Sequence, residues 1–279
     1  MRFFGLIALG TLLACASATA QQETYKSIEV AEGVYSFGGG PFAYFTMFVV
    51  SDDGVLVADP VNPDLATAMI REIRSITTKP IRYVVYSHNH WDHISGGQIF
   101  KDAGAVVISH VEAKDAIRAN PNVITPDRVW AGNRFDIEMG NKTIQLHYFG
   151  ANHGDGMTVM LLPEEQVLFT ADLVVPERVG FMFMPDFSPQ NWIRTLKEME
   201  GLQFQTALFA HDHPVGTKQH VIVQREYLED LTAAVGKALQ SGDMMLQTLS
   251  LPKYQDWAYY EEWLGMNGAR VMLEMMMGY

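Results

Sequence analysis

The sequence predicts an α/β fold in which sheets are covered by helices on their outer faces. The chain has 279 residues, of which 48% are hydrophobic and 19% are charged, so it can bury a sizeable core. Strand and helix patterns are interspersed along both halves of the sequence. No internal repeat, low-complexity tract or linker rich in proline and serine separates the halves. We therefore expect a single domain.

The first half contains short apolar or alternating runs bounded by turn residues, which predict strands. These strands are expected at Val34–Phe37, Tyr44–Val50, Val55–Ala58, Ile81–Tyr86 and Ala105–Ile108. The sequence Asp52-Asp53-Gly54, between the second and third of them, is typical of a hairpin turn. Apolar residues at helical spacing predict helices over Pro63–Ile76 and Val111–Ile117.

The second half is richer in strand patterns and ends in helices. Strands are expected at Thr143–Tyr148, Met157–Leu162, Val167–Thr170 and Thr206–Ala210. Helices are expected over Asn191–Met199, Gln219–Leu239 and Trp257–Met276. Methionines recur along the last helix, and we interpret them as its packing face. These residues are Met272, Met275, Met276 and Met277.

The amino terminus has the pattern of a targeting segment. Arg2 precedes the apolar run Phe3–Ala14, which is too short to span a bilayer, and Ala18-Thr19-Ala20 fits a cleavage site. Residues 1–20 are therefore predicted to be a signal peptide and residues 21–279 the mature domain. In the alternative, Leu12–Cys15 resembles a bacterial lipobox with Cys15 acylated. Both interpretations predict a periplasmic or secreted protein with no transmembrane segment after processing.

The composition restricts the partners and the chemistry. Thirty-two acidic residues against twenty basic ones give a net charge of -12, which disfavours nucleic acids and anionic membranes. The single cysteine lies in the predicted leader, so the mature chain has no thiol for catalysis or for soft metal ions. We expect a small-molecule substrate, and any metal site must use imidazole and carboxylate ligands.

Four potential metal ligands follow the predicted strand Ile81–Tyr86 within six residues. They are His88, His90, Asp92 and His93. Side-chain alternation places the first two histidines on one side of an extended segment. The aspartate and the third histidine lie where the chain turns into the next helix. Imidazole and carboxylate groups suit zinc and also iron, so this segment predicts a metal site.

At these residues the chain resembles the metallo-β-lactamase superfamily, and three further motifs extend the resemblance over most of the mature chain. His153 lies in a loop before the apolar strand that ends at Leu162-Pro163. Asp172 ends the run Phe169–Asp172, in which alanine replaces the usual glycine. His211 follows the strand Thr206–Ala210. His213 is the alternative for this last position, because Pro214-Val215-Gly216 resembles the residues after the motif histidine.

The resemblance implies a four-layer αβ/βα sandwich with the site at the sheet edge between its two halves. It further implies that His88, His90 and His153 bind a first metal ion, with Asp172 bridging. Asp92, His93 and His211 would bind a second ion. The implied cofactors are two zinc ions per chain, with iron or manganese as alternatives.

The activity implied is that of an exported di-zinc hydrolase. A hydroxide bridging the metal ions would attack the carbonyl of a lactam, lactone, ester or thioester. Asp92 would act as the catalytic residue that orients the hydroxide and relays a proton. Alternatives on the same fold are a β-lactamase proper, a non-haem iron oxygenase and a non-catalytic binding protein.

Two segments are candidates for the walls of the cleft. They are Gly38–Phe45 and Val179–Pro185, and both are rich in glycine or aromatic residues. If they line the cleft, the substrate would carry an apolar or aromatic acyl group; the alternative is that they pack in the core. Asp59 is interpreted as a turn residue or as a group that orients a ligand histidine. Isolated histidines are expected to be structural, namely His110, His147 and His220.

Overall fold

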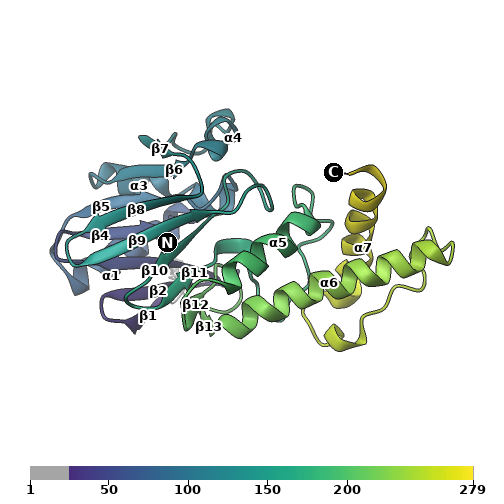
Figure 1. The fold of residues 1–279 in the computed structure, drawn as a ribbon. Coiled ribbons are helices and arrows are strands. Elements are labelled where there is room, and N and C mark those ends of the chain that lie inside the picture. The colour runs from purple at the N-terminus through teal and green to yellow at the C-terminus, as the bar shows by residue number, and fades with distance from the viewer. Residues whose placement is uncertain (1–24, 279) are drawn as a thin grey trace, which may run out of the picture.

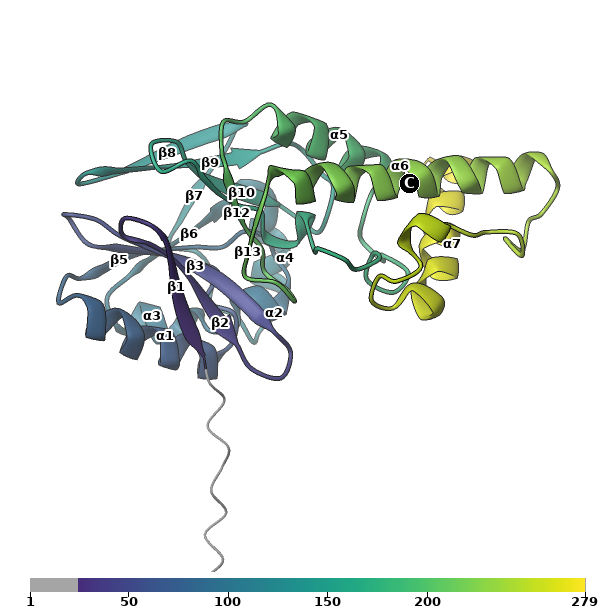
Figure 2. The same ribbon diagram turned by 90° about the horizontal axis from the view of Figure 1, so that it is seen from below.

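The computed structural model describes residues 25–278, which form four layers in the order helix, sheet, sheet, helix (Figure 1). Figure 2 shows the two sheets facing each other, with α1 below one sheet and α5 and α6 above the other. The α/β sandwich predicted from the sequence is confirmed. The predicted signal peptide and Cys15 lie outside the described residues.

The first sheet has seven strands in the order β1-β2-β3-β4-β5-β6-β7. Strands β1 to β4 pair antiparallel, and β4 to β7 pair parallel. The strands are β1 (Lys26–Ala31), β2 (Val34–Gly39), β3 (Tyr44–Val50), β4 (Val55–Ala58), β5 (Ile81–Val85), β6 (Val106–His110) and β7 (Arg128–Trp130). The helices that connect the parallel strands are α1 (Pro63–Ile76), α2 (Trp91–Ile94), α3 (Gly97–Asp102), η1 (Val111–Ala113) and α4 (Lys114–Ala119).

The second sheet has six strands in the order β13-β12-β11-β10-β9-β8. Only β11 and β12 pair parallel, and the other neighbours are antiparallel. The strands are β8 (Arg134–Met139), β9 (Lys142–Tyr148), β10 (Thr158–Leu162), β11 (Val167–Phe169), β12 (Thr206–Leu208) and β13 (Val215–Thr217). The helices of this half are η2 (Ala171–Leu173), α5 (Pro189–Glu200), α6 (Lys218–Gln240), η3 (Pro252–Tyr254) and α7 (Tyr260–Met277).

The strand directions explain why distant motifs meet at one edge of the sandwich. In the first sheet the parallel strands β4 and β5 end at the same edge, where the loops with Asp59 and His88 begin. In the second sheet β11 and β12 also end together, each three positions before its ligand, Asp172 or His211. Strand β10 runs antiparallel to β11, so its beginning, just after His153, lies at the same edge.

The strand and helix predictions succeed where the apolar pattern is strong. The predicted bounds of β3, β4 and α1 match the structure residue for residue. Four strands were not predicted, among them β1, in which no residue is buried, and β8, in which four of six residues are exposed. Strand β1 is held mainly by backbone pairing with β2, whereas β8 pairs with β9 and also buries Ile137 and Met139 in the core.

The prediction that the methionines form the packing face of α7 is wrong for the last three of them. Met275, Met276 and Met277 are exposed, whereas Glu274 is buried. The Glu274 carboxylate accepts a hydrogen bond from Ser188 Oγ at 2.6 Å and another from the Gln190 amide at 3.0 Å. Because these donors lie at the amino terminus of α5, the carboxylate caps that helix and complements its dipole.

Asn267 is the second polar side chain of α7 that is buried against the rest of the fold. Its Oδ1 accepts a hydrogen bond from the Tyr227 hydroxyl of α6 at 2.6 Å. Its Nδ2 donates to the carbonyl of Gly180 at 2.9 Å and to that of Met182 at 2.5 Å. Asn267 therefore joins α7 to the long helix α6 and to the loop that follows η2.

Within residues 25–278, none of the helices has the length and apolar character needed to cross a membrane.

Candidate metal centre

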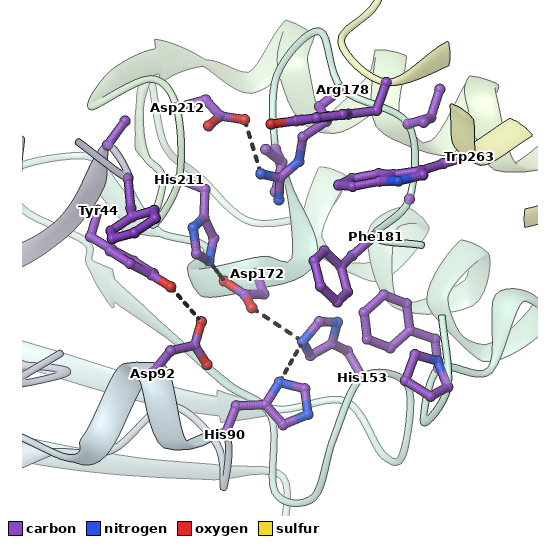
Figure 3. A pocket seen from close by; sticks show the side chains of 18 of the residues that line it. Tyr44, His90, Asp92, His153, Asp172, Arg178, Phe181, His211, Asp212 and Trp263 are labelled. Atoms are coloured by element: carbon purple, nitrogen blue, oxygen red, sulfur yellow. Dashed lines mark hydrogen bonds and ion pairs between the residues drawn. The ribbon is translucent and has the colours of Figure 1, made fainter. Parts of the chain in front are cut away.

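The structure brings all seven predicted site residues together at the shared edge of the two sheets. Together with Asp59, they form three overlapping groups, and within each group the candidate ligand atoms lie within 4.8 Å of one another. The groups are His88, His90, His153 and Asp172; Asp92, His93 and His211; and Asp59, His88 and His93. Part of this arrangement is drawn in Figure 3.

Asp172 lies at the centre of the cluster, and its two oxygens face different histidines. Its Oδ1 is 3.0 Å from Nε2 of His93 and 3.0 Å from Nε2 of His211. Its Oδ2 is 3.3 Å from Nε2 of His153 and 3.8 Å from Nε2 of His88. One carboxylate thus joins two sets of imidazoles, which is the geometry a bridging ligand requires.

Close backbone packing holds the histidine loops in place. The Thr158 amide at the start of β10 donates to the carbonyl of Ser87 at 2.7 Å, so the two loops lie side by side. Gly154, directly after His153, has a φ of +56°. A Cβ atom there would lie 3.1 Å from His88 Cδ2 and 3.1 Å from His90 Nε2. Glycine is therefore required for both its backbone conformation and its small size.

Asp59 orients one histidine of the cluster. This fully buried carboxylate accepts hydrogen bonds from the amide and the hydroxyl of Ser87, at 2.7 and 2.6 Å. It also contacts Nδ1 of His93 at 3.1 Å. Because Nδ1 is engaged in this way, Nε2 of His93 is the nitrogen that faces Asp172.

Burial and charge act in opposite directions on the titration of the cluster. Burial lowers the pKa of His88 well below its usual value and also lowers that of His153. Burial alone would lower the pKa of His93, but the carboxylates of Asp172 and Asp92 raise it well above its usual value. Burial would raise the pKa of Asp172, yet His93 and His211 hold it far below its usual range. The Asp172 carboxylate is therefore an anion at neutral pH.

The donor set fits divalent metal ions. Nε2 of His88 is buried and has no hydrogen-bond partner within the described part of the chain. Unpaired buried nitrogens cost free energy, and coordination to an ion removes that cost. Imidazole and carboxylate groups are the ligands that zinc, iron and manganese accept in proteins.

The structure separates the two candidates for the last motif histidine. His211 contacts Asp172, whereas His213 is exposed and belongs to none of the three groups. The histidines predicted to be structural belong to none of these groups and have other partners. His110 stacks on Tyr148 and accepts a hydrogen bond from the Glu112 amide. His147 stacks on Phe149, and His220 accepts from the Thr217 amide at the start of α6.

A cavity of about 650 Å³ opens over the cluster. Both segments predicted as walls do line it, through residues 41–44 of the first and Val179, Gly180, Phe181 and Pro185 of the second. The part of the wall that the C-terminal region supplies was not predicted from the sequence. Trp263 of α7 stacks on Tyr259 with ring centroids 4.0 Å apart and meets the edge of Phe181 at 5.3 Å (Figure 3).

Three polar contacts in the cavity wall also escaped the sequence analysis. The Tyr44 hydroxyl donates to Asp92 Oδ2 at 3.2 Å, and His90 Nε2 lies 2.5 Å from Asp186 Oδ2. Arg178 forms an ion pair with Asp212 at 3.1 Å. The partners are between 34 and 96 residues apart along the chain, so no local sequence pattern marks these pairs.

Among the curated proteins to which the chain is similar are the alpha and beta subunits of the 2,4-dinitroanisole O-demethylase of Nocardioides sp. (strain JS1661). The alpha subunit is 27% identical over 170 residues, which is 60% of this chain and 52% of the subunit. The beta subunit is 26% identical over 251 residues, or 84% of this chain and 77% of the subunit. The chain thus matches only about half the length of the alpha subunit.

Solved structures share the fold at low sequence identity. A metallo-beta-lactamase from Pontibacter korlensis superposes with a TM-score of 0.66 at 16% identity, covering 74% of this chain and 99% of that one. A double mutant of the sec-alkyl sulfatase PisA1 superposes with a TM-score of 0.74 at 15% identity, covering 91% of this chain and 50% of that one. The profile of the Metallo-beta-lactamase superfamily matches residues 39–211, from the end of β2 to the last histidine of the cluster. The chain belongs to the metallo-beta-lactamase superfamily.

Proposed function

We propose that this protein is a metal-dependent hydrolase that cleaves small molecules carrying an apolar or aromatic group. The observation that carries the proposal is the position of Asp172, whose two oxygens face two sets of imidazoles at the base of an open cavity. Superfamily membership supports it, because most members are metal-dependent enzymes. We assign the susceptible bond to the carbonyl of a lactam, lactone, ester or thioester.

The proposed metal ions are two zinc ions. His88, His90 and His153 would hold the first, Asp92, His93 and His211 the second, and Asp172 both. When bound, such ions lower the pKa of water and polarise a carbonyl oxygen. Asp92 lines the cavity, and we assign to it the role of accepting the proton of the attacking water.

The cavity wall supports an aromatic substrate group. Phe42 and Trp91 line the cavity and are 74% and 55% exposed, and Phe181 and Tyr259 are each 48% exposed. Large aromatic side chains that remain this exposed around one cavity are typical of a ligand site. The planar walls would orient the substrate and exclude water from around the susceptible bond.

A second candidate reaction is hydrolytic O-demethylation of an aryl methyl ether. Similarity to both subunits of the 2,4-dinitroanisole O-demethylase favours it. In the hydrolytic form, water adds to the ether and the products are a phenol and methanol. An iron oxygenase would instead consume dioxygen and a reductant and release formaldehyde, so the one-carbon product separates the two chemistries.

The test is a hydrolysis panel with matched metal analysis. The purified protein is stripped with a chelator and reloaded with zinc, iron(II) or manganese. It is then assayed on 4-nitrophenyl esters, lactones, thioesters, nitrocefin and 2,4-dinitroanisole. We expect zinc-dependent hydrolysis of at least one aryl ester. Preferential turnover of nitrocefin would identify a β-lactamase, iron-dependent oxygen consumption an oxygenase, and inactivity in every metal form would overturn the proposal.

Shortening Trp263 to alanine is expected to raise KM for an aryl ester by about ten- to a hundredfold, because roughly 1–3 kcal/mol of aromatic contact is lost. KM for the matching methyl or acetyl substrate should change much less. Phe135→Ala is the control, because Phe135 is a part-exposed aromatic residue of β8 outside the cavity. Equal effects of Trp263→Ala on aryl and small alkyl substrates would contradict an aromatic subsite.

We also propose that the protein is exported to the periplasm or secreted. The proposal is based on the signal-peptide pattern of residues 1–20. Mass spectrometry of the mature protein should give an amino terminus at Gln21. An acylated Cys15 would identify a lipoprotein instead, and an intact Met1 would contradict export.

A further inference from the structure

We propose that two side chains in the cavity wall, Tyr44 and Asp186, are positioning residues, one for each metal subsite. The inference rests on the proposed function, because it assigns roles toward the two metal ions. It concerns residues outside the seven candidate ligands, and they lie on opposite sides of the sandwich. Tyr44 begins β3 of the first sheet, and Asp186 lies in the loop between η2 and α5 of the second half.

Tyr44 touches two candidate ligands of the second ion at once. Its hydroxyl donates a hydrogen bond to Asp92 Oδ2 at 3.2 Å, and its ring lies against His211 with centroids 4.9 Å apart (Figure 3). A phenol is protonated at neutral pH and can only donate to a carboxylate. The contact therefore holds the Asp92 carboxylate in one rotational position. The other carboxylate oxygen, Oδ1, takes no part in this hydrogen bond.

The backbone around Tyr44 makes this contact rigid. Tyr44 forms an antiparallel bridge with His211, and the Phe45 amide donates to the Ala210 carbonyl at 2.8 Å. The Asp212 amide donates to the Ala43 carbonyl at 3.0 Å on the other side. These backbone contacts hold the start of β3 against the segment that carries His211. Through its hydroxyl and its ring, Tyr44 therefore contacts one candidate ligand from each half of the molecule.

Asp186 has the equivalent relation to the first subsite. Nδ1 of His90 faces Nε2 of His153 at 3.2 Å, inside the cluster, while its Nε2 points outward to Asp186 Oδ2 at 2.5 Å. A carboxylate on the outer nitrogen fixes the tautomer of the imidazole and makes the inner nitrogen a better ligand. Asp186 belongs to none of the three ligand groups, so it acts through His90.

The two contacts engage different ligands of the cluster. The Tyr44 side chain meets Asp92 and His211, which belong to the second subsite, and the Asp186 carboxylate meets His90, which belongs to the first. Loss of an outer contact of this kind weakens metal binding by about 10- to 100-fold. The two side chains should therefore affect different binding steps.

The experiment measures zinc affinity directly. The metal-free full-length protein is titrated with zinc in competition with a chromophoric chelator, which resolves two binding steps. We expect Tyr44→Phe to weaken one step by about 10- to 100-fold and Asp186→Asn to weaken the other by a similar factor. The double variant should weaken both. Tyr35→Phe and Asp136→Asn are matched controls, on β2 and β8 outside the cavity lining, and should leave both steps unchanged.

The conservative variant separates positioning from packing. Tyr44→Phe keeps the ring against His211 and removes only the hydroxyl, so its melting temperature should stay near that of the wild type. Tyr44→Leu removes both and should weaken the same step further. The inference is wrong if Tyr44→Phe or Asp186→Asn binds zinc with wild-type affinity, or if both variants lose the same binding step. Either result would leave the proposed function unaffected. A wild-type chain that binds no zinc would overturn the proposed function and this inference together.

Discussion

Replacing Asp172 with alanine is expected to abolish hydrolysis while leaving the chain folded. The carboxylate lies within 3.8 Å of four imidazoles through its two oxygens, so its loss removes the anionic group shared by the two proposed metal subsites. Stabilisation of developing charge by such a site is worth several kcal/mol, and about 4 kcal/mol corresponds to roughly a thousandfold in rate. We therefore expect kcat/KM to fall by a factor on the order of 1,000 or more.

The measurement pairs activity with folding and metal content. Asp172→Asn keeps the shape of the side chain and should behave like Asp172→Ala, because charge and not volume is lost. Asp136→Asn, on the exposed strand β8, serves as the control. Circular dichroism should show a folded chain in every variant, and bound zinc should fall in the Asp172 variants alone. More than a tenth of wild-type activity in either Asp172 variant would contradict a bridging role.

Replacing Asn267 with alanine should give the largest loss of stability among single polar substitutions. The side chain is fully buried and satisfies the Tyr227 hydroxyl and the carbonyls of Gly180 and Met182. A buried polar group left without a partner costs about 1–3 kcal/mol. Three such groups lose their partner together, so we expect roughly 3–5 kcal/mol and a fall in melting temperature of about 10 °C.

Thermal unfolding of the zinc-loaded protein is the appropriate measurement for this variant. Asn191→Ala, an exposed position on α5, should change the melting temperature by no more than about 2 °C, as surface substitutions usually do. Because Asn267 holds the loop that carries Phe181, we also expect a higher KM for aryl substrates in the folded variant. A melting temperature equal to that of the wild type would show that the three groups find other partners.

The fold and the ligand cluster could be predicted because their signals are local. Apolar periodicity gave the bounds of α1, and the ligands of one loop lie within six residues of each other. The three remaining ligands each follow or precede a short apolar strand in a recognisable motif. Even the alanine at position 171 is informative, since its φ of +47° explains why glycine is usual there.

The cavity wall could not be predicted because its contacts join distant parts of the chain. Tyr44 and Asp92 are 48 residues apart, and His90 and Asp186 are 96 apart. The burial of Glu274 among exposed methionines reverses the usual preference, because a carboxylate at a helix amino terminus is stabilised by the backbone donors there. The hydrophobicity pattern of the sequence therefore could not predict the polar contacts of Tyr44, Asp186 and Glu274.

The place of α7 in the fold separates two parts of the site. All seven candidate ligands precede residue 212, whereas Tyr259 and Trp263 of the cavity wall follow it by more than forty positions. Glu274 and Asn267 attach α7 to α5 and α6. Substitutions in this aromatic part of the wall can therefore change the shape of the cavity while every candidate ligand stays in place.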